Sequence, residues 1–392
     1  MKYFFFVLLV LVLWIVIDLH LGSKKRKQTS SSWIETTGNA TFIGDGDDFF
    51  RQLLSDIDSA SQEIQMMFYI FRNDETGQKV IDHLCKKAGS GVLIYLLVDY
   101  GGSHGLKKST ITKMRSCGIH FSYSRKISFP NFFTSLNERN HRKITVIDGK
   151  IGYIGGFNVG NEYAGKDPKF GYWRDYHLRL TGEAVKGLQD QFVHDWMENH
   201  SSPIEAVSAD LEKGAETLTF HITNGSDIEK SFASYIDKAT TSIKIGTPYY
   251  IPGQTVQTSL LRALKCGVSV QIILPMRADH PLVKEASYPY LVELIKAGCE
   301  VYQYMNGFYH AKVMVIDDTF CDIGTANFDQ RSFHINGEIN CLLHSPDFIS
   351  EIKEVIKKDL LQSERLDLKR LQDRSIGNRM LAPIARLFSP FL

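Results

Sequence analysis

The chain lacks the cysteine patterns of a zinc protein or of a disulfide-stapled protein. Its six cysteines are scattered through 392 residues, and none forms a C-x-x-C pair. Four of them lie inside apolar stretches and are expected to be small buried hydrophobic residues: Cys85, Cys266, Cys321 and Cys341. This distribution favours a reducing compartment over a disulfide framework and disfavours a zinc site.

The chain also lacks an excess of charge of either sign. Lys and Arg together number 45, and Asp and Glu together number 44. Nucleic-acid-binding proteins commonly carry a broad positive field, so we expect no nucleic-acid partner. An anionic substrate must then be held by local positive charge. The composition, 43% hydrophobic and 23% charged, is that of a globular protein long enough for two cores.

Only one long apolar run is present, at the start of the chain. Residues 3–17 carry no charge, and a basic cluster follows at residues 24–27. A cleaved signal peptide is one interpretation, but no small-x-small cleavage site follows the run. An uncleaved helix is the other, and its basic flank would keep the following domains in the cytoplasm. We predict a single-pass cell-membrane anchor over residues 1–22, a linker over 23–32 and catalytic domains on the cytoplasmic side.

From residue 47 onward the pattern is α/β, and its order occurs twice. A strand at 63–71, a helix at 77–88 and a buried strand at 92–98 correspond to segments 241–250, 257–265 and 267–274. Such a duplication predicts two similar domains, each a mixed β-sheet flanked by helices and related by a pseudo-twofold axis. We place the domains at 33–205 and 206–392, the second ending in an amphipathic tail.

A short motif of the form H-x-K-x4-D is repeated, once in each half. The six motif residues are the candidate catalytic set: His141, Lys143, Asp148, His310, Lys312 and Asp317. After the same gap, each copy reaches a small-residue turn that ends in a candidate substrate-binding residue, Asn158 or Asn327. Matching residues at matching offsets predict two half-sites that meet in one shared active site.

These residue types suit a phosphodiester substrate. One imidazole can attack phosphorus while the other gives a proton to the leaving alkoxide and later takes one from the incoming hydroxyl. Lys and Asn donors can stabilise charge on the non-bridging oxygens, so we expect no cofactor and no metal. The apolar surroundings predict a strand that puts His141 and Lys143 on one face. Asp148, at an Asp-Gly turn, is expected to fix the turn backbone.

A carboxylate beside each ring would hold its tautomer. The candidates for these supporting carboxylates are Asp175 and Glu338, and nearby His177 is expected to be structural. The symmetry of the two motifs does not say which histidine is the nucleophile.

The paired motifs closely resemble those of the phospholipase D superfamily. Together with the anchor, the segment Trp173-Arg174-Asp175 and the apolar C-terminal end, they resemble its bacterial cardiolipin synthases. The resemblance implies two phospholipase D-type domains with one active site. It also implies phosphatidyl transfer from one phosphatidylglycerol to another, with release of glycerol, through a covalent phosphatidyl-histidine. In that family pattern His141 is the nucleophile and His310 the acid/base. One apparent anchor, where two are common, is a departure from the pattern.

Other functions remain open. The same site could serve a hydrolase (a phospholipase or a nuclease) or a transferase to another alcohol, and an idle membrane scaffold is a third class. The intact half-sites argue against the scaffold, and the balanced charge and the anchor argue against a nuclease.

Two further segments could meet the membrane and its anionic head groups. Residues 125–142 mix four arginines and lysines with three phenylalanines, and form either a solvated loop or an interfacial one. Residues 380–388 could be core or an interfacial tail.

Overall fold

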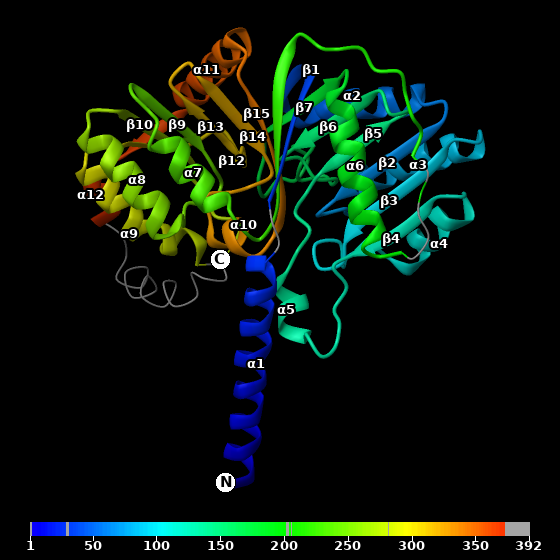
Figure 1. Cartoon of the computed structure of the whole chain (residues 1–392), viewed down its shortest axis with the longest axis horizontal. Coiled ribbons are helices and arrows are strands. Elements are labelled where there is room, and N and C mark those ends of the chain that lie inside the picture. The colour runs from blue at the N-terminus through cyan, green and yellow to red at the C-terminus, as the bar shows by residue number, and fades with distance from the viewer. Residues whose placement is uncertain (1, 29–30, 201–203, 205, 281, 373–392) are drawn as a thin grey trace.

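The structure is a computed structural model that describes residues 2–28, 31–200, 204, 206–280 and 282–372. Helix α1 (Lys2–Gln28) projects from an α/β body whose two halves lie on either side of a central group of strands (Figure 1). The predicted tail at residues 380–388 lies outside the described residues.

The first half alternates strands and helices. Its elements are β1 (Ser32–Asp45), α2 (Gly46–Ser59), β2 (Glu63–Phe68), α3 (Glu75–Gly89), β3 (Leu93–Asp99), α4 (Lys108–Ser116), β4 (His120–Ser124), α5 (Phe132–Asn137), β5 (Ile144–Ile147), β6 (Ile151–Gly155), β7 (Trp173–Thr181) and α6 (Ala184–Met197).

The second half repeats the main order, with β12 (Phe308–Tyr309) in place of α5, an added α10 (Gln330–His334), and further elements at its end. Its elements are β8 (Glu216–Asn224), α7 (Ile228–Ile236), β9 (Ser242–Gly246), α8 (Gly253–Lys265), β10 (Ser269–Pro275), α9 (Val283–Lys296), β11 (Glu300–Tyr304), β12 (Phe308–Tyr309), β13 (Val313–Ile316), β14 (Phe320–Gly324), α10 (Gln330–His334), β15 (Gly337–Leu343), α11 (Pro346–Leu361), β16 (Ser363–Leu366) and α12 (Leu368–Gln372).

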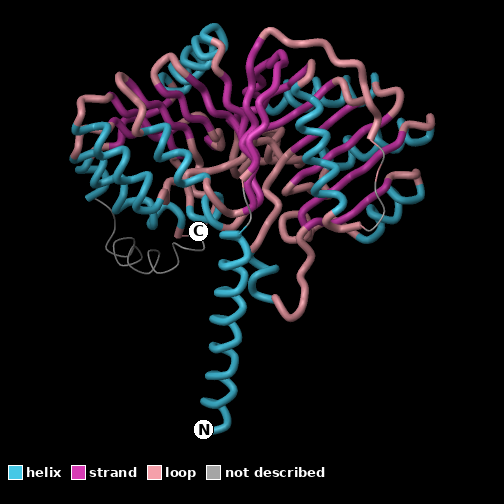
Figure 2. Tube along the Cα trace, viewed as in Figure 1, coloured by secondary structure: helices cyan, strands magenta, loops and turns pink. Residues whose placement is uncertain are grey.

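The described strands form one 16-stranded sheet in which the two halves meet at the antiparallel pair β1–β8. Outward from that pair the order is β1-β7-β6-β5-β2-β3-β4 on one side and β8-β15-β14-β13-β9-β10-β11, then β16, on the other, and β12 pairs with β7 off this path. In each half three outer strands pair in parallel, β2-β3-β4 and β9-β10-β11, whereas the strands nearer the centre pair antiparallel along this order, as does the added edge strand β16. This matched order confirms the predicted duplication and the mixed sheets. Figure 2 shows the strands running through the centre with helices around them.

Three apolar cores hold helices against the sheet. One lies under α2, α3 and α4 of the first half, and another lies under α7, α8 and α9 of the second. The third joins α6 to α11 and contains residues of both halves, such as Phe192 and Ile352. Burial of apolar surface is the dominant stabilising term in folding, so this shared core favours a fixed arrangement of the halves.

Cysteine burial differs in part from the prediction. Cys321 and Cys341 are buried, whereas Cys85 is only partly buried and Cys266 is exposed. Cys266 is exposed because it lies at the C-cap of α8, beyond the helix face that packs on the sheet.

Helix α1 is longer than the predicted anchor and continues into the predicted linker, to Gln28. Residues Tyr3–Arg26 are long and apolar enough to cross a membrane. The insert before the first motif contacts this helix through α5. Two of its four basic residues do not face outward, contrary to an interfacial role for them. Arg139 is buried against Asp99 at 3.3 Å, and Arg142 is fully buried against Asp195 at 3.0 Å.

Candidate active site

The histidine and lysine of each motif lie just before a strand rather than within it. His141 and Lys143 precede β5, while His310 and Lys312 lie between β12 and β13. The strand prediction is therefore correct for the residues after each lysine and for β12 before His310, but not for the histidines and lysines themselves. The histidine backbones bond to the opposite half instead. The amide of His141 donates to the carbonyl of Gly337 at 2.9 Å, and that of His310 donates to the carbonyl of Arg174 at 2.7 Å.

Each histidine ring contacts a carboxylate from the other half. Nδ1 of His141 lies 2.9 Å from Oε2 of Glu338, and Nδ1 of His310 lies 2.5 Å from Oδ2 of Asp175. All four side chains are buried. The structure thus places both predicted carboxylates beside the motif histidines. In each pair the histidine and the carboxylate come from different halves of the chain.

The two carboxylates are held by their surroundings. Thr325 Oγ1 donates to the same Oε2 of Glu338 at 2.6 Å, and the Tyr176 amide donates to Asp175 Oδ1 at 2.8 Å. Gly156 leaves room for Asp175, because a Cβ at residue 156 would lie 1.9 Å from Oδ1. Burial alone would raise the pKa of both acids. The neighbouring groups outweigh it, chiefly the Lys312 ammonium for Asp175 and the hydrogen-bonded His141 ring for Glu338, and both pKa values are lowered.

The two lysines lie beside their histidines, as the two-residue spacing predicts. Lys143 Nζ donates to the carbonyl of His141 at 2.6 Å, and Lys312 Nζ lies 2.7 Å from Nδ1 of His310. Burial lowers the pKa of Lys143 to about 7 and that of Lys312 to about 8, despite the opposing effects of Glu338 and Asp175. Lys312 also lowers the pKa values of Lys143 and His141, so the half-sites are electrostatically coupled.

Both imidazoles are held neutral near pH 7. Burial lowers the pKa of His141 to about 4 and that of His310 to about 4, with the neighbouring lysines acting in the same direction. A neutral ring that donates Nδ1–H to a carboxylate keeps a lone pair on Nε2. Such a nitrogen can act as a nucleophile or as a base. A bound phosphodiester anion would favour protonation of one ring, which could then act as an acid.

The motif aspartates do not reach the histidines but tie down a neighbouring segment. Asp148 accepts bonds from the amides of residues 61, 62 and 63 at 2.8–2.9 Å. Asp317 accepts bonds from the amides of residues 240, 241 and 242 at 2.7–2.9 Å. The carboxylates therefore hold the starts of β2 and β9, rather than only their own turns as predicted. These contacts fit the structural role expected for the two aspartates, and a direct catalytic role for either stays a prediction.

The two turn asparagines are buried and already partly bonded. Asn158 Oδ1 accepts from the Ile70 amide at 3.0 Å, and Asn327 Nδ2 donates to Asp329 Oδ2 at 3.0 Å. Their contact with a substrate stays a prediction. His177 is buried, and its Nδ1 accepts from the Phe157 amide at 3.3 Å, consistent with a structural role.

Two aromatic residues beside the histidines were not predicted as part of the site. The Tyr69 ring centroid lies 5.0 Å from that of His141, and Lys143 Nζ lies 5.5 Å from the same tyrosine ring. The Trp173 ring lies 4.9 Å from that of His310. Trp173 lies two residues before Asp175, which is a usable signal. Tyr69 follows β2 and lies within the repeated segment 63–71, but it belongs to neither H-x-K-x4-D motif.

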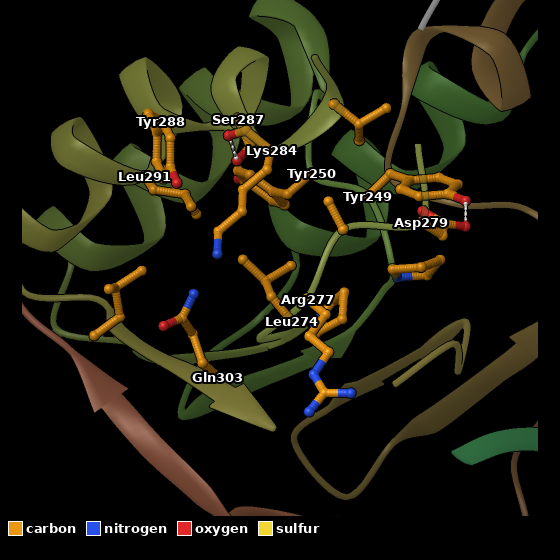
Figure 3. Close-up of a pocket in the computed structure, with 15 residues that line it drawn as sticks. Tyr249, Tyr250, Leu274, Arg277, Asp279, Lys284, Ser287, Tyr288, Leu291 and Gln303 are labelled. Atoms are coloured by element: carbon orange, nitrogen blue, oxygen red, sulfur yellow. Dashed lines mark hydrogen bonds between the residues drawn. The ribbon is translucent and has the colours of Figure 1, made fainter. Parts of the chain in front are cut away.

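The pocket drawn in Figure 3 lies apart from the paired motifs. Figure 3 shows a pocket in the second half, lined by Tyr249, Lys284 and Gln303 among others, but by no motif residue. Over the described part of the chain, no group of three or more His, Cys, Asp and Glu side chains is arranged to hold a metal ion.

Comparisons with known proteins bear on the family and the fold of the chain. A family model described as "Cardiolipin synthase, PLD-like domain" matches residues 53–196 and 232–360. The chain is 39% identical to the minor cardiolipin synthase ClsB of Bacillus subtilis (strain 168), with 100% of both chains covered. It is 38% identical to a cardiolipin synthase of Staphylococcus aureus (strain Mu50), over 93% of this chain and 75% of that protein. The solved structure of phosphatidylserine synthase from Haemophilus influenzae Rd KW20 has a similar fold, with a TM-score of 0.73 at 14% identity, covering 94% of this chain and 99% of that one.

Proposed function

Because the chain belongs to the cardiolipin synthase family of phospholipase D-like proteins, we propose that it makes cardiolipin from two molecules of phosphatidylglycerol. The observation that carries this proposal is the crossed pairing of His141 with Glu338 and of His310 with Asp175. It gives one site two oriented imidazoles and two buried lysines, which are the groups that a phosphodiester exchange needs.

In the first step Nε2 of His141 attacks the phosphorus of phosphatidylglycerol. The bond from phosphorus to the head-group glycerol oxygen breaks, and the protonated ring of His310 gives that oxygen its proton. The products are glycerol and a phosphatidyl group bound to His141. Lys143 and Lys312 stabilise the negative charge on the non-bridging oxygens.

In the second step a hydroxyl of another phosphatidylglycerol takes the place of glycerol. Neutral His310 removes its proton as the oxygen attacks phosphorus, and the phosphorus–nitrogen bond to His141 breaks. Cardiolipin leaves and both rings return to their starting states. Glu338 and Asp175 hold the Nδ1–H tautomers throughout, so each Nε2 stays aimed at the reacting atoms.

The apolar helix α1 supports a position at the membrane, where both lipid substrates are found. We propose that α1 crosses the bilayer with the α/β body on the cytoplasmic side, as the basic residues after the apolar run favour. A lipid hydroxyl concentrated at the surface could then compete with water for the intermediate.

The test is incubation of the detergent-solubilised protein with labelled phosphatidylglycerol. Cardiolipin and glycerol in equal amounts are the expected products. Formation of phosphatidic acid without cardiolipin would show that the protein is a hydrolase. No turnover would contradict the proposal and favour a membrane scaffold. His141→Ala protein, prepared in the same way, controls for contaminating enzymes.

A further inference from the structure

The insert between β4 and the first motif is built into helix α1 rather than lying free. The ring centroid of Trp14 is 5.0 Å from that of Phe133, 6.2 Å from Phe132 and 6.3 Å from Phe129. Figure 1 shows α5 beside the upper part of α1, where the helix leaves the body. The apolar part of the insert therefore accompanies the apolar part of the helix.

Polar contacts fix this arrangement one to three turns further along α1. Asp18 is buried, and its Oδ2 accepts from the amides of Phe133 at 2.6 Å and Thr134 at 3.3 Å. Gly22 packs against Thr134 so closely that a Cβ on residue 22 would lie 2.4 Å from its side chain. Arg26 donates to Glu138 at 2.6 Å. The helix therefore forms one wall of the space that remains between the two segments, and the insert forms the other.

That space is a cavity of about 360 Å³ with a polar, cationic lining. It is lined by Leu21, Gly22, Lys25, Arg125, Lys126, Ser128, Asn131, Thr134, Ser135 and Glu138. Lys25 and Lys126 are exposed. Arg125 lies 3.6 Å from Glu198, and the one acid in the lining, Glu138, is already bonded to Arg26. Positive charge therefore exceeds negative charge, and the two lysines can still meet an anion.

With α1 placed across a bilayer, the cavity would lie at the depth of the phospholipid phosphates. Lys25 follows Trp14 by about 16 Å along the helix axis at 1.5 Å per residue, so it lies beyond the aromatic cluster and about 12 Å beyond residue 17, where the uncharged run ends. With α1 in the bilayer, Trp14 and the insert phenylalanines lie in the apolar region, and Lys25 lies among the head groups. Cations at that depth attract anionic lipid.

We propose that this cavity is a binding site for the head group of an anionic phospholipid, separate from the paired histidines. Lys25 and Lys126 contact the phosphate, and the hydroxyl and amide groups of Ser128 and Asn131 face the polar remainder of the head group. No motif residue lines the cavity. The site rests on the proposed placement of α1 in the bilayer but not on the transfer reaction, so a binding assay and a turnover assay can fail independently.

The test is lipid binding by the full chain in a neutral maltoside detergent, counted by native mass spectrometry. All proteins carry His141→Ala, so that bound lipid is not consumed. The probes are dihexanoyl phosphatidylglycerol, dihexanoyl phosphatidylcholine and inorganic phosphate. Lys25→Gln/Lys126→Gln removes both cavity lysines, whereas Lys24→Gln/Lys108→Gln removes two exposed lysines that do not line the cavity. An unchanged melting temperature shows that each double variant folds.

We expect one class of phosphatidylglycerol sites to weaken about tenfold in the cavity variant and less than twofold in the matched control. Equal weakening in both variants would mean diffuse surface charge and overturn the site, as would no weakening in either. Equal retention of phosphatidylcholine would overturn selectivity for an anionic lipid. If inorganic phosphate at the same concentration displaced all of the bound phosphatidylglycerol from this site, the ligand would be free phosphate rather than a lipid.

Discussion

Oε2 of Glu338 lies 2.9 Å from Nδ1 of His141, although 197 residues separate the two in the sequence. The reciprocal pair, His310 and Asp175, spans 135 residues. Each half of the chain therefore supplies the ring of one pair and the carboxylate of the other. Neither half holds a complete histidine–carboxylate pair, so the duplication cannot be read as two independent sites.

Glu338→Gln should lower kcat strongly while leaving the fold intact. The amide keeps the size of the side chain, but it carries no charge to orient the His141 ring or to stabilise its protonated state. Replacing the comparable carboxylate in the Ser-His-Asp triad by an amide costs about 10⁴-fold in kcat, and we expect a loss of up to about that size. Steady-state turnover of phosphatidylglycerol measures it.

A double variant separates this role from simple damage. If Glu338 acts through His141, Glu338→Gln should cost little more activity in a His141→Ala background, because residues that act as a unit are not additive. Full additivity of the two losses would contradict the assignment. The melting temperatures of all three proteins provide the control for folding.

The two histidines should differ when the leaving group no longer needs a proton. With an aryl phosphodiester, whose leaving group departs as a stable anion, His310→Ala should still form the covalent intermediate and give a burst of phenolate. His141→Ala should give none, because the attacking nitrogen is missing. Rapid-mixing absorbance follows the burst, and acid-quenched protein is digested to locate the modified histidine. A burst in His141→Ala but not in His310→Ala would reverse the assignment of nucleophile and acid/base.

Much of this site could be predicted from the sequence, because the repeat marks the residues twice. His141 and His310 stand out by matching offsets, and so do their lysines. Asp175 and Glu338 could be chosen by residue type, but not assigned to a ring, because the pairing depends on how β12 lies parallel to β7 and how Asn140 bridges to Gly337. Tyr69 lies in a repeated segment but outside both motifs, so no chemical pattern pointed to it. The sequence predicted that Asp148 has a structural role at a turn. It did not predict that its carboxylate binds the amides of residues 61–63.

Asp148→Asn should destabilise the protein rather than remove its chemistry. The carboxylate accepts three backbone amides and the Ser61 hydroxyl, and an amide would turn one acceptor into a donor facing other donors. A buried unsatisfied group costs about 1–3 kcal/mol, so we expect the free energy of unfolding to fall by about that amount. The rate per folded molecule should change less than threefold. Chemical denaturation and active-site titration on the same sample measure both, and a rate loss above a hundredfold with normal stability would restore a direct catalytic role.

The alkaline side of the activity profile should report the buried lysines. The pKa values of Lys143 and Lys312 are lowered to about 7 and about 8, so each lysine is charged below its pKa and loses its proton as the pH rises through it. The free enzyme then loses affinity for a phosphodiester anion, and kcat/KM should fall above about pH 7. The alkaline fall in kcat should occur at higher pH than the fall in kcat/KM, because the bound substrate anion raises the pKa of a neighbouring ammonium. Lys143→Arg, which stays charged over this range, should move the fall in kcat/KM to the pKa of Lys312, about 8. An unchanged limb in an active, stably folded Lys143→Arg protein would show that another group controls it.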